Sequence, residues 1–417
     1  MIAVSFVIGL VIGGAVGYSA SVFAAPSTSA AKTYTLGVIQ PLTGEYAEYG
    51  KSFLQSAQLA VAQMNANLSA AGNNIQFKIV SADDAGTASG ANTALQTMYS
   101  TYSIHVLVGP LTSGEVAGLL QTADTDHIVV LPPAATATSL EYPRSSTNYL
   151  MRPGQPGDQF EGSALGKTML QLGAKNVVYI YRDDTSEYGT FNISSAILTG
   201  AGIHVDGIAY QPNQNDYSAQ VSSAASDVQQ FLASDSNKSQ TVVALGGGGT
   251  EASNIFTHAM SDIPLGSVRW FGIESLDDPT LLTGSVGPFM AQVNLTITSP
   301  SSFTSPQGNY FNSTYVAQYG SAPLPYSNYA YDNTWIAMLS ILIAGSNNGP
   351  AILSAVPIAA DHYFGATGTG VWLDNNNEQT FAYYDILKVV PMSSSTSSVV
   401  QIGQYNGATN TVTLSST

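Results

Sequence analysis

The stretch "HVLVGPLTSGEVAGLLQTADTDHIVVLPP", residues 105–133, decides the fold because it contains a strand, a helix and a second strand in succession. The apolar segments "HVLVG" (105–109) and "HIVVLPP" (127–133) predict two short buried strands. Between them, "SGEVAGLLQTAD" (113–124) has Ser113 placed to cap a helix, Glu115 in the first turn, and then an apolar face. A helix that joins two buried strands indicates a parallel βαβ unit.

The same alternation extends in both directions along the chain. A Pro- and Gly-rich interruption, "NYLMRPGQPGDQ" (148–159), separates two runs of similar pattern. The other expected strands are 34–39, 75–83, 176–183, 203–210, 241–246 and 268–273. The other expected helices are 51–68, 88–100, 160–172, 186–201, 217–233, 329–344 and one that follows 246–249. The alternation predicts an α/β fold with two doubly wound parallel-sheet lobes.

The chain is expected to cross between the two lobes more than once. Its 417 residues exceed what one hydrophobic core usually serves. A second crossing is expected within "NLTITSPSSFTSP" (294–306), and the tail from about residue 380 is expected to form edge strands. The expected lobes are 34–152 plus about 300–380, and 153–299 plus about 381–417. Repeated crossings predict a hinge, with the ligand-binding carboxyl ends of the strands of both lobes facing one cleft.

Composition excludes several classes of partner and chemistry. Charged residues make up 9% of the chain, against about 25% in ordinary globular proteins. The 27 acids and 11 bases give a net charge of −16, which disfavours nucleic acid as a partner. The shortage of charge, together with 23 Tyr and abundant Ser, Thr and Asn, suits a protein exposed to an external medium. The chain has no Cys, which excludes disulfides, thiol catalysis and zinc–thiolate sites.

The N-terminal segment indicates export. Residues 1–25 carry no charge and are long enough to span a bilayer, while "VFAAP" (22–26) offers small residues for cleavage. An export signal and an uncleaved membrane anchor both remain open, followed by a polar tether at 26–33. The expected location is extracellular or periplasmic. Five glycosylation sequons fit an exported chain; they begin at Asn67, Asn192, Asn237, Asn294 and Asn312.

Catalytic motifs are scarce. No G-x-S-x-G elbow or phosphate-binding G-x-x-x-x-G-K-[ST] loop occurs, and the five His residues lie without metal-ligand spacing. No metal or cofactor is therefore expected. The glycine run 246–249 follows a strand but lacks the Lys of a phosphate loop. Close approach of a ligand to the backbone at Gly247 and a flexible turn are equally good interpretations of this run.

Four polar or small-residue features follow strands of the predicted sheets. Ser113 begins a helix, where free N–H groups favour an anion. "PPAATAT" (132–138) is made of small residues that leave backbone groups accessible, and "RDDTSEYG" (182–189) contains Tyr188. "FGIESLDD" (271–278) places Glu274 at a strand end. Each feature alone has an ordinary structural explanation, but together an anion site and a carboxylate predict a site for a zwitterion.

At these residues the sequence resembles the branched-chain amino-acid type of solute-binding protein of ABC importers, which has the type I periplasmic-binding-protein fold. The resemblance runs from about Tyr34 to Asp385. It rests on the ordered appearance of "GVIQPLTGEYAEYGKS", "VSADDAG", "VGPLTSGEVA", "PAATAT", "EYG" and "YDNTWIAML". The six motifs in this order are specific to the family, whereas any one of them alone is not.

The resemblance implies roles for the groups that bind the main chain of the ligand. Ser113 and Thr136 would hold the α-carboxylate through hydroxyl and N–H groups. The Ala134 carbonyl, the Thr136 hydroxyl and the Glu274 carboxylate would hold the α-ammonium, with Ala135 in the same loop. Charge-assisted hydrogen bonds of this kind contribute about 1.5–3 kcal/mol each.

The side-chain pocket is less defined. Tyr49 and Tyr188 would wall it from opposite lobes. Family members often have an aromatic residue after the strand that corresponds to "VVALGGGG" (242–249), whereas this chain has only glycines. The glycines widen the pocket or let backbone, including Gly247, replace a side chain. The segment "IES" (273–275) retains the acidic residue of the family, Glu274. A carboxylate at this position favours an amino acid as the ligand over a neutral amide or urea.

The resemblance implies an exported, non-enzymatic receptor that closes two lobes on a hydrophobic or branched-chain amino acid or a similar small zwitterion. It would deliver this ligand to the membrane permease of an ABC importer, and we expect a monomer. Two alternatives stay open. One is an extracellular sensing domain on the same fold. The other is an extracellular hydrolase that pairs Glu274 with Asp277 or Asp278.

Overall fold

The computed structural model describes residues 32–141, 145–154, 156–234, 239–301, 305–368, 371, 373–380 and 382–415. The expected export signal or anchor, most of the tether and the Asn237 sequon lie outside these residues. The described chain divides into two compact units. Unit 1 contains the chain up to Ala135 with Glu141–Gln155 and Ser302–Thr380, and unit 2 contains Thr136–Leu140, Pro156–Ser301 and Phe381–Thr417.

Unit 1 is built on a sheet of four parallel strands in the order β2-β1-β3-β4. The strands are β1 (Lys32–Gln40), β2 (Ile75–Asp83), β3 (Val106–Val108) and β4 (Val129–Leu131). In the register, Gly37 of β1 pairs with Leu107 of β3, and Val108 pairs with Leu131 of β4. Every residue of β3 and β4 is buried, as their uninterrupted apolar runs predict for a parallel sheet covered on both faces.

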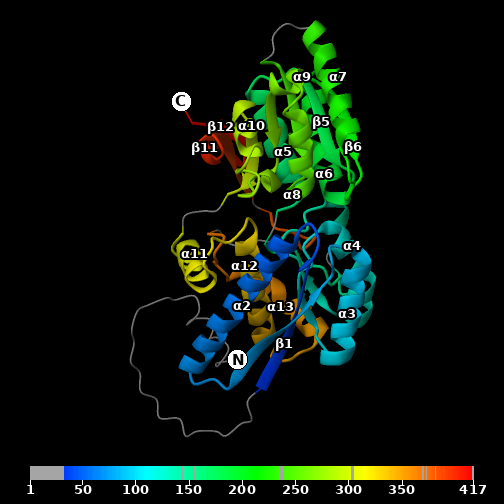
Figure 1. Cartoon of the computed structure of the whole chain (residues 1–417). Coiled ribbons are helices and arrows are strands. Elements are labelled where there is room, and N and C mark those ends of the chain that lie inside the picture. The colour runs from blue at the N-terminus through cyan, green and yellow to red at the C-terminus, as the bar shows by residue number, and fades with distance from the viewer. Residues whose placement is uncertain are drawn as a thin grey trace. The chain divides into compact units, whose positions relative to one another are not determined.

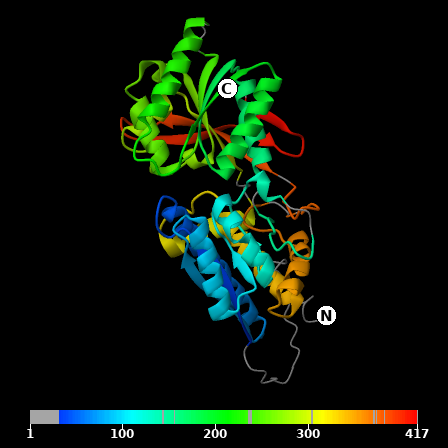
Figure 2. The ribbon, with the colours of Figure 1, turned by 90° about the vertical axis from the view of Figure 1, so that its right-hand side faces the viewer.

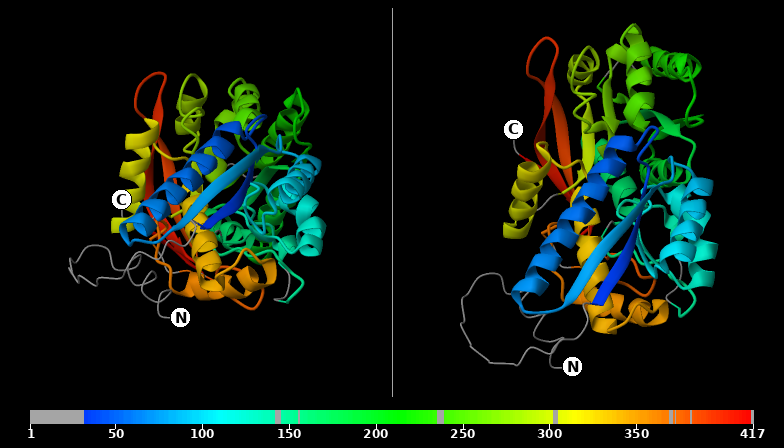
Figure 3. Two further views of the ribbon diagram at one scale, coloured as in Figure 1. Left: turned by 90° about the horizontal axis from the view of Figure 1, so that it is seen from below. Right: turned by 60° about the horizontal axis from the view of Figure 1, so that its bottom comes forward.

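Helices cover both faces of the sheet of unit 1. They are α2 (Ala47–Ala70), α3 (Ala88–Tyr102), α4 (Ser113–Asp126), α11 (Pro306–Tyr319), α12 (Ser327–Ala344) and α13 (Gly349–Asp361). Helices α2, α12 and α13 pack on one face, and α3 and α4 pack together on the other (Figures 1 and 3). The main core of the unit lies under α2 and α12, where Val38, Leu131 and Trp335 belong to one buried cluster. Helices α11 and α13 are present in the structure but were not predicted from the sequence.

Unit 2 is built on a mixed sheet of eight strands in the order β12-β11-β10-β9-β8-β7-β5-β6. The strands are β5 (Asn176–Arg182), β6 (His204–Tyr210), β7 (Thr241–Gly246), β8 (Arg269–Gly272), β9 (Thr296–Pro300), β10 (Tyr383–Pro391), β11 (Ser397–Asn406) and β12 (Thr411–Leu414). Strands β5 to β9 are parallel, and β10 to β12 extend the sheet in antiparallel fashion (Figure 2). The prediction that the tail forms only edge strands is wrong for β10, which lies between β9 and β11 because its backbone pairs on both sides.

Two buried clusters mark the two faces of the sheet of unit 2. Helices α5 (Asp158–Gln171) and α6 (Thr185–Gly200) pack against one face, with Leu165 and Leu198 in its core. On the other face lie α7 (Ser218–Ser234), α8 (Gly249–Ala259), α9 (Ile263–Gly266) and α10 (Val286–Gln292), with Phe256 and Trp270 in the core. Two 3₁₀ turns, η1 (Thr138–Leu140) and η2 (Glu274–Leu276), follow strand ends. The predicted α/β fold with doubly wound parallel strands in two lobes is confirmed.

This topology positions the candidate residues. The carboxyl ends of parallel strands lie at one edge of a sheet, where α/β proteins bind ligands. In unit 1 the loops after β1, β3 and β4 meet at such an edge, and in unit 2 those after β5, β7 and β8 do so. Among the described ranges, no single helix is long and apolar enough to cross a membrane. The bent pair α12 and α13, at 117°, passes that test only when the two helices are taken together.

Candidate functional site

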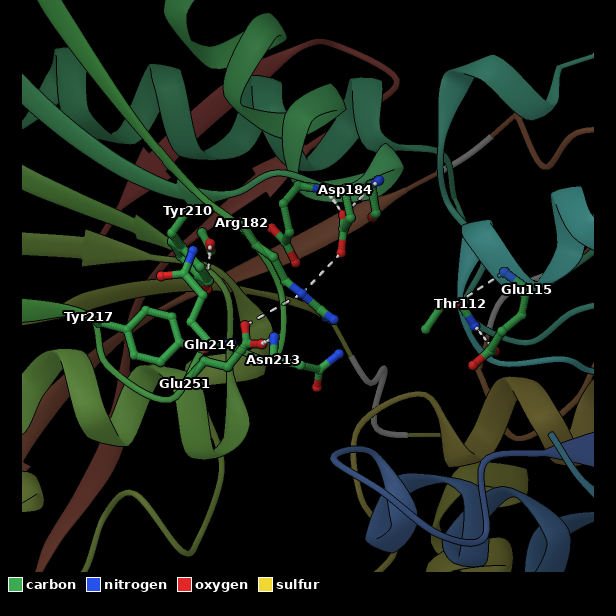
Figure 4. A network of polar contacts seen from close by, with 12 residues as sticks. Thr112, Glu115, Arg182, Asp184, Tyr210, Asn213, Gln214, Tyr217 and Glu251 are labelled. Carbon is green, nitrogen blue, oxygen red and sulfur yellow. Dashed lines mark hydrogen bonds and ion pairs between the residues drawn. The ribbon is translucent and has the colours of Figure 1, made fainter. Parts of the chain in front are cut away.

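In unit 1, the loop after β3 ends in a capped helix. Thr112, not Ser113, is the N-cap of α4. The Oγ1 atom of Thr112 accepts a hydrogen bond from the Glu115 N–H at 3.3 Å, and Glu115 Oε2 accepts one from the Thr112 N–H at 2.7 Å (Figure 4). The predicted capping role of Ser113 is wrong because Thr112 has the extended backbone of a cap and Ser113 is already helical. Ser113 is buried as the first residue of α4.

Tyr49 and Ala134 lie on one apolar cluster of unit 1, with Phe53, Leu111 and Tyr329 among its buried members. The Tyr49 ring meets the ring of Phe53 edge to face, with 6.3 Å between centroids. Leu111 precedes the start of α4, and Ala134 follows β4. The structure therefore brings the predicted residues Tyr49 and Ala134 to the same cluster, close to the start of α4.

Two buried side chains hold the loop after β4. The Nδ2 atom of Asn333 donates hydrogen bonds to the carbonyls of Leu131, at 3.4 Å, and Pro132, at 3.1 Å. The Nη1 atom of Arg152 donates to the carbonyl of Ala135 at 2.9 Å. The small residues of this loop thus let two long polar side chains of the protein itself reach its backbone. Ala135 is fully buried, and its carbonyl is occupied by Arg152.

Arg152, Asn333 and Glu378 were not among the residues predicted from the sequence. Glu378 accepts from the Nε atom of Arg152 at 2.8 Å through Oε1, and its Oε2 lies 2.6 Å from the same nitrogen. Burial raises the pKa of Glu378 to about 7, although the charge of Arg152 and its hydrogen bond act in the opposite direction. Glu378 is 226 residues from Arg152, so no local pattern reveals this pair.

The loop after β4 passes from unit 1 to unit 2 between Ala135 and Thr136. The carbonyl of Thr136 accepts a hydrogen bond from the N–H of Asp158, at the start of α5, at 2.8 Å. Its hydroxyl lies 3.0 Å from that of Ser186, which donates to Asp158 Oδ1 at 3.4 Å. Thr136 is therefore tied to the N-termini of α5 and α6.

Tyr188 is partly exposed within unit 2. Its side chain is 48% exposed, and its ring lies 6.2 Å from that of Tyr181 and 6.4 Å from that of Phe191, between centroids. Tyr188 thus sits at the edge of an aromatic group on α6 and β5.

Gly247 allows a close approach, but by a side chain of the protein. Gly247 is buried with φ +148°, and a Cβ at this position would collide with the hydroxyl of Tyr210. This hydroxyl donates a hydrogen bond to the Gly246 carbonyl at 3.5 Å. Strand β7 contains no aromatic residue. The aromatic side chain beside the glycine run is therefore Tyr210, which comes from β6.

Arg182 ends β5 and is held between two acids (Figure 4). Its Nε atom lies 3.4 Å from Asp184 Oδ2 and 3.4 Å from Glu251 Oε2. Asp184 also caps α6 by accepting from the N–H groups of Ser186 and Glu187 at 3.0 Å each. Glu251 accepts from the backbone of the loop before α7 as well. The charge of Arg182 is thus offset within its own surroundings.

Three carboxyl groups gather at the same strand-end edge of unit 2. Glu161 comes from the first turn of α5, Glu187 from the first turn of α6, and Glu274 from η2, directly after β8. We call these three residues the carboxyl cluster. The carboxyl of Glu161 is within hydrogen-bonding distance of that of Glu274, and Glu187 Oε2 would lie 3.2 Å from a Cβ built on Gly246.

The electrostatics of the carboxyl cluster favour bound protons or a cation. Burial, followed by the charge of Glu274, raises the pKa of Glu161 well above its ordinary value. Burial, followed by the charge of Asp184, does the same for Glu187, although Arg182 acts in the opposite direction. Two carboxyl groups can hydrogen-bond only when one of them holds a proton. Of these three residues, the sequence pattern indicated only Glu274, because acids in the first turn of a helix are common and carry no functional signal.

The other acids of the Glu274 loop have a local structural role. Asp278 accepts hydrogen bonds from the N–H of Thr280 at 2.7 Å and from its hydroxyl at 2.8 Å, as in a tight turn. Burial and then the charge of Asp278 raise the pKa of Asp277 to about 6. Within the part of the chain that the structure describes, no group of three or more His, Asp or Glu side chains is arranged to hold a metal ion.

Comparison with known proteins agrees with this architecture. A family model described as "Periplasmic binding protein" matches residues 33–390. A Leu/Ile/Val-binding protein of Rhizobium johnstonii is 30% identical over 187 residues, which cover 44% of this chain and 49% of that protein. The chain spans about half the length of the curated relatives it matches.

Solved structures share the fold at low identity. The leucine-binding protein LivK of Thermotoga maritima superposes with a TM-score of 0.73 at 20% identity, covering 88% of this chain and 97% of that one. A solute-binding protein of an ABC transporter from Rhodopseudomonas palustris, in complex with benzoate, gives a TM-score of 0.71 at 16% identity, covering 89% and 96%. These likenesses establish the fold.

Proposed function

Because this chain belongs to the periplasmic binding protein family, we propose that it is the substrate-binding component of an ABC importer and captures an amino acid. Membership implies a periplasmic or extracellular location and a small-molecule ligand. Delivery of that ligand to a membrane permease, and capture by the two units acting together, are part of the proposal. Both rest on family membership and on relatives that are named Leu/Ile/Val-binding proteins.

The ligand is a zwitterion in this proposal. Its α-carboxylate is held by groups at the start of α4, near Ser113, and by Thr136. Its α-ammonium is held by the Ala134 carbonyl, the Thr136 hydroxyl and the carboxylate of Glu274. Tyr49 and Tyr188 contact its side chain. The small residues at 134–136 support this assignment because backbone groups of this loop accept hydrogen bonds from polar partners, as the carbonyls of Ala135 and Thr136 do from Arg152 and Asp158.

The carboxyl cluster is the observation that carries the proposal. Glu274 lies at the end of β8, and its hydrogen-bonding neighbour, Glu161, is another carboxyl group. An ammonium group gains charge-assisted hydrogen bonds from such surroundings, whereas an anion is repelled. The cluster therefore favours an amino acid over an aromatic acid such as the benzoate bound by the neighbour from Rhodopseudomonas palustris.

Calorimetry with the full chain tests this function. We expect leucine or a related amino acid to bind and benzoate not to bind. Replacing Glu274 with Ala or Gln removes the charge that faces the ammonium, and we expect a loss of affinity of about tenfold or more. Asp227→Asn, which removes one negative charge from α7 of the same unit, is the matched control and should keep the affinity. Unchanged affinity in Glu274→Gln, with normal circular dichroism, would contradict the proposal.

A further inference from the structure

We propose that the carboxyl cluster of unit 2 binds a second amino group, so that the preferred ligand is a diamino carboxylic acid such as ornithine or lysine. This inference rests on the proposed function, because it names the class of amino acid that the same site selects. It departs from the branched-chain class that the sequence resemblance implies.

The first support is the number of carboxyl groups that meet. Glu161, Glu187 and Glu274 come from three separate elements, α5, α6 and η2, and converge at the strand-end edge of the sheet. Glu161 and Glu274 are in hydrogen-bonding contact. The charge of Glu274 also acts on Glu187. A single α-ammonium requires one such carboxylate, which leaves two carboxyl groups for a further cationic group.

The second support is a buried oxygen atom without a donor. Glu161 is only 5% exposed. Its Oε1 atom accepts no hydrogen bond from an N–H or hydroxyl of the described residues, and the same holds for Oε2 of Glu274, whose carboxyl adjoins that of Glu161. A buried acceptor left without a donor costs about 1–3 kcal/mol, and more when it is charged. An ammonium group of a ligand has three N–H donors and relieves this cost.

The third support is the sign of the charges that act most strongly on Glu161. The charges that act on it most strongly are those of Glu274, Glu187 and Asp158, and all three are acidic. Arg182 acts on Glu187, but its own guanidinium lies 3.4 Å from carboxylates of Asp184 and of a second acid on α8. Its charge is therefore offset locally by these two acids, and the ammonium of a ligand would be a cation that the carboxyl groups of the cluster do not already share.

The shape of the cluster favours an organic cation over a metal ion. In the described residues, no three carboxyl or imidazole groups are arranged to hold a metal. Metal coordination needs oxygen atoms within about 2.0–2.6 Å of one point, whereas an ammonium donates over about 2.7–2.9 Å. Carboxyl groups that approach one another without sharing a coordination point suit N–H donors.

Calorimetry with the full chain and four probes tests the inference. Lysine and ornithine carry the second amino group, norleucine matches the carbon chain of lysine but lacks that group, and putrescine has two amino groups and no carboxylate. We expect lysine or ornithine to bind about tenfold or more tightly than norleucine. Equal or tighter binding of norleucine would overturn the inference and leave the proposed function intact.

The remaining outcomes separate the two proposals. Binding of putrescine with no binding of any amino acid would support the cation site and contradict amino-acid capture. Binding of none of the probes would overturn both. In Glu161→Gln, which keeps the size of the side chain, we expect lysine to lose about tenfold in affinity while norleucine stays within about twofold. An equal loss for both ligands would assign Glu161 a structural role only, and Asp227→Asn on α7 is the control for a change of charge.

Discussion

Arg152 and Glu378 form a buried ion pair, with Nε of the arginine 2.6 Å from Oε2 of the glutamate, and the same guanidinium donates to the carbonyl of Ala135. Arg152 is fully buried and Glu378 nearly so. One buried cation thus ties a residue late in unit 1 to the loop after β4. The guanidinium of Arg152 therefore positions the loop that carries the proposed ligand contact of Ala134.

Removing the cation of this pair should destabilise unit 1 strongly. Arg152→Leu leaves the buried Glu378 and the Ala135 carbonyl without their donor. We expect the free energy of unfolding to fall by about 3–5 kcal/mol, since breaking a buried pair by removing one partner has a cost of that size. Urea denaturation followed by circular dichroism measures it.

The double variant Arg152→Leu/Glu378→Leu is the control for that experiment. It removes the uncompensated acid, so it should recover a large part of the loss seen in Arg152→Leu. Additive losses in the two single variants would show that the pair contributes no coupling. That result would contradict its assigned role in holding the loop.

Replacing Gly247 should disrupt the strand-end edge of unit 2. Gly247→Ala places a Cβ onto the Tyr210 hydroxyl at a φ of +148°, which side chains rarely adopt. We expect a loss of about 1–3 kcal/mol in the free energy of unfolding. Gly266→Ala is the matched control, because the nearest atom to its Cβ would lie at an ordinary 3.6 Å. A normal melting temperature in Gly247→Ala would show that Tyr210 moves away without cost.

The parallel core was predictable because its signal is local. Runs such as those at 106–108 and 129–131 are apolar throughout, and the intervening helix has the matching period. The cap of α4 was missed by one residue, although Thr112 followed by Glu115 has the spacing of a capping box and identifies the correct N-cap. The interior position of β10 depends on pairing with β9, which a strand pattern alone does not report.

The candidate site was only partly predictable, because some of its residues have a local sequence signal and others meet only through the fold. Ala134 and Glu274 could be proposed from the sequence because small residues and acids directly after strands are visible there, and their roles stay predictions. Arg152 and Asn333 contact the loop after β4 from positions 17 and about 200 residues away in the sequence, so their roles appear only in the fold. Glu161 resembles any acid in the first turn of a helix, and only its burial against Glu274 distinguishes it.

Stability should fall as pH rises from about 4.5 to about 7.5, the reverse of most proteins with paired acids. Burial raises the pKa of Glu115 to about 7, with the charge of Asp84 as the next cause, and burial raises those of Asp84 and Asp332 to about 6. In this window the folded chain binds more protons than the unfolded chain, whose acids titrate near their ordinary values. The stability contributed by these acids is complete below their unfolded pKa values and is lost as pH rises through 6 to 7. The melting temperature measures it.

Glu115→Gln should flatten this pH dependence, because an amide oxygen can still accept from the Thr112 N–H but does not titrate. Glu48→Gln, at an exposed position on α2, removes the same charge and should leave the slope unchanged.

Asp83 has the opposite effect on the pH dependence of stability, because its pKa is lowered. Burial favours a higher pKa for Asp83, but hydrogen bonds, led by that of Thr43, lower it. A melting temperature that rises from pH 4.5 to pH 7.5 would contradict the prediction.

Binding of an amino acid should release protons from the carboxyl cluster. Burial raises the pKa values of Glu161 and Glu187 well above their ordinary range, so these carboxyl groups keep their protons to higher pH than exposed carboxyl groups do. An ammonium favours their ionised forms, and its arrival lowers these pKa values. We therefore expect affinity to increase with pH, and the observed enthalpy to become more negative in a buffer of higher ionisation enthalpy, such as Tris against phosphate.

The neighbouring titratable groups define the controls for proton release. Asp158 on α5, Asp184 before α6 and Tyr179 on β5 face the cluster, and the charge of Arg182 acts on Glu187. Tyr179 holds its proton throughout, because burial raises its pKa well above the ordinary value. Glu161→Gln should remove a large part of the buffer dependence, whereas Asp227→Asn should keep it. Identical enthalpies in the two buffers would mean that the cluster is already ionised before the ligand binds, and that its carboxyl groups do not exchange protons for the ammonium.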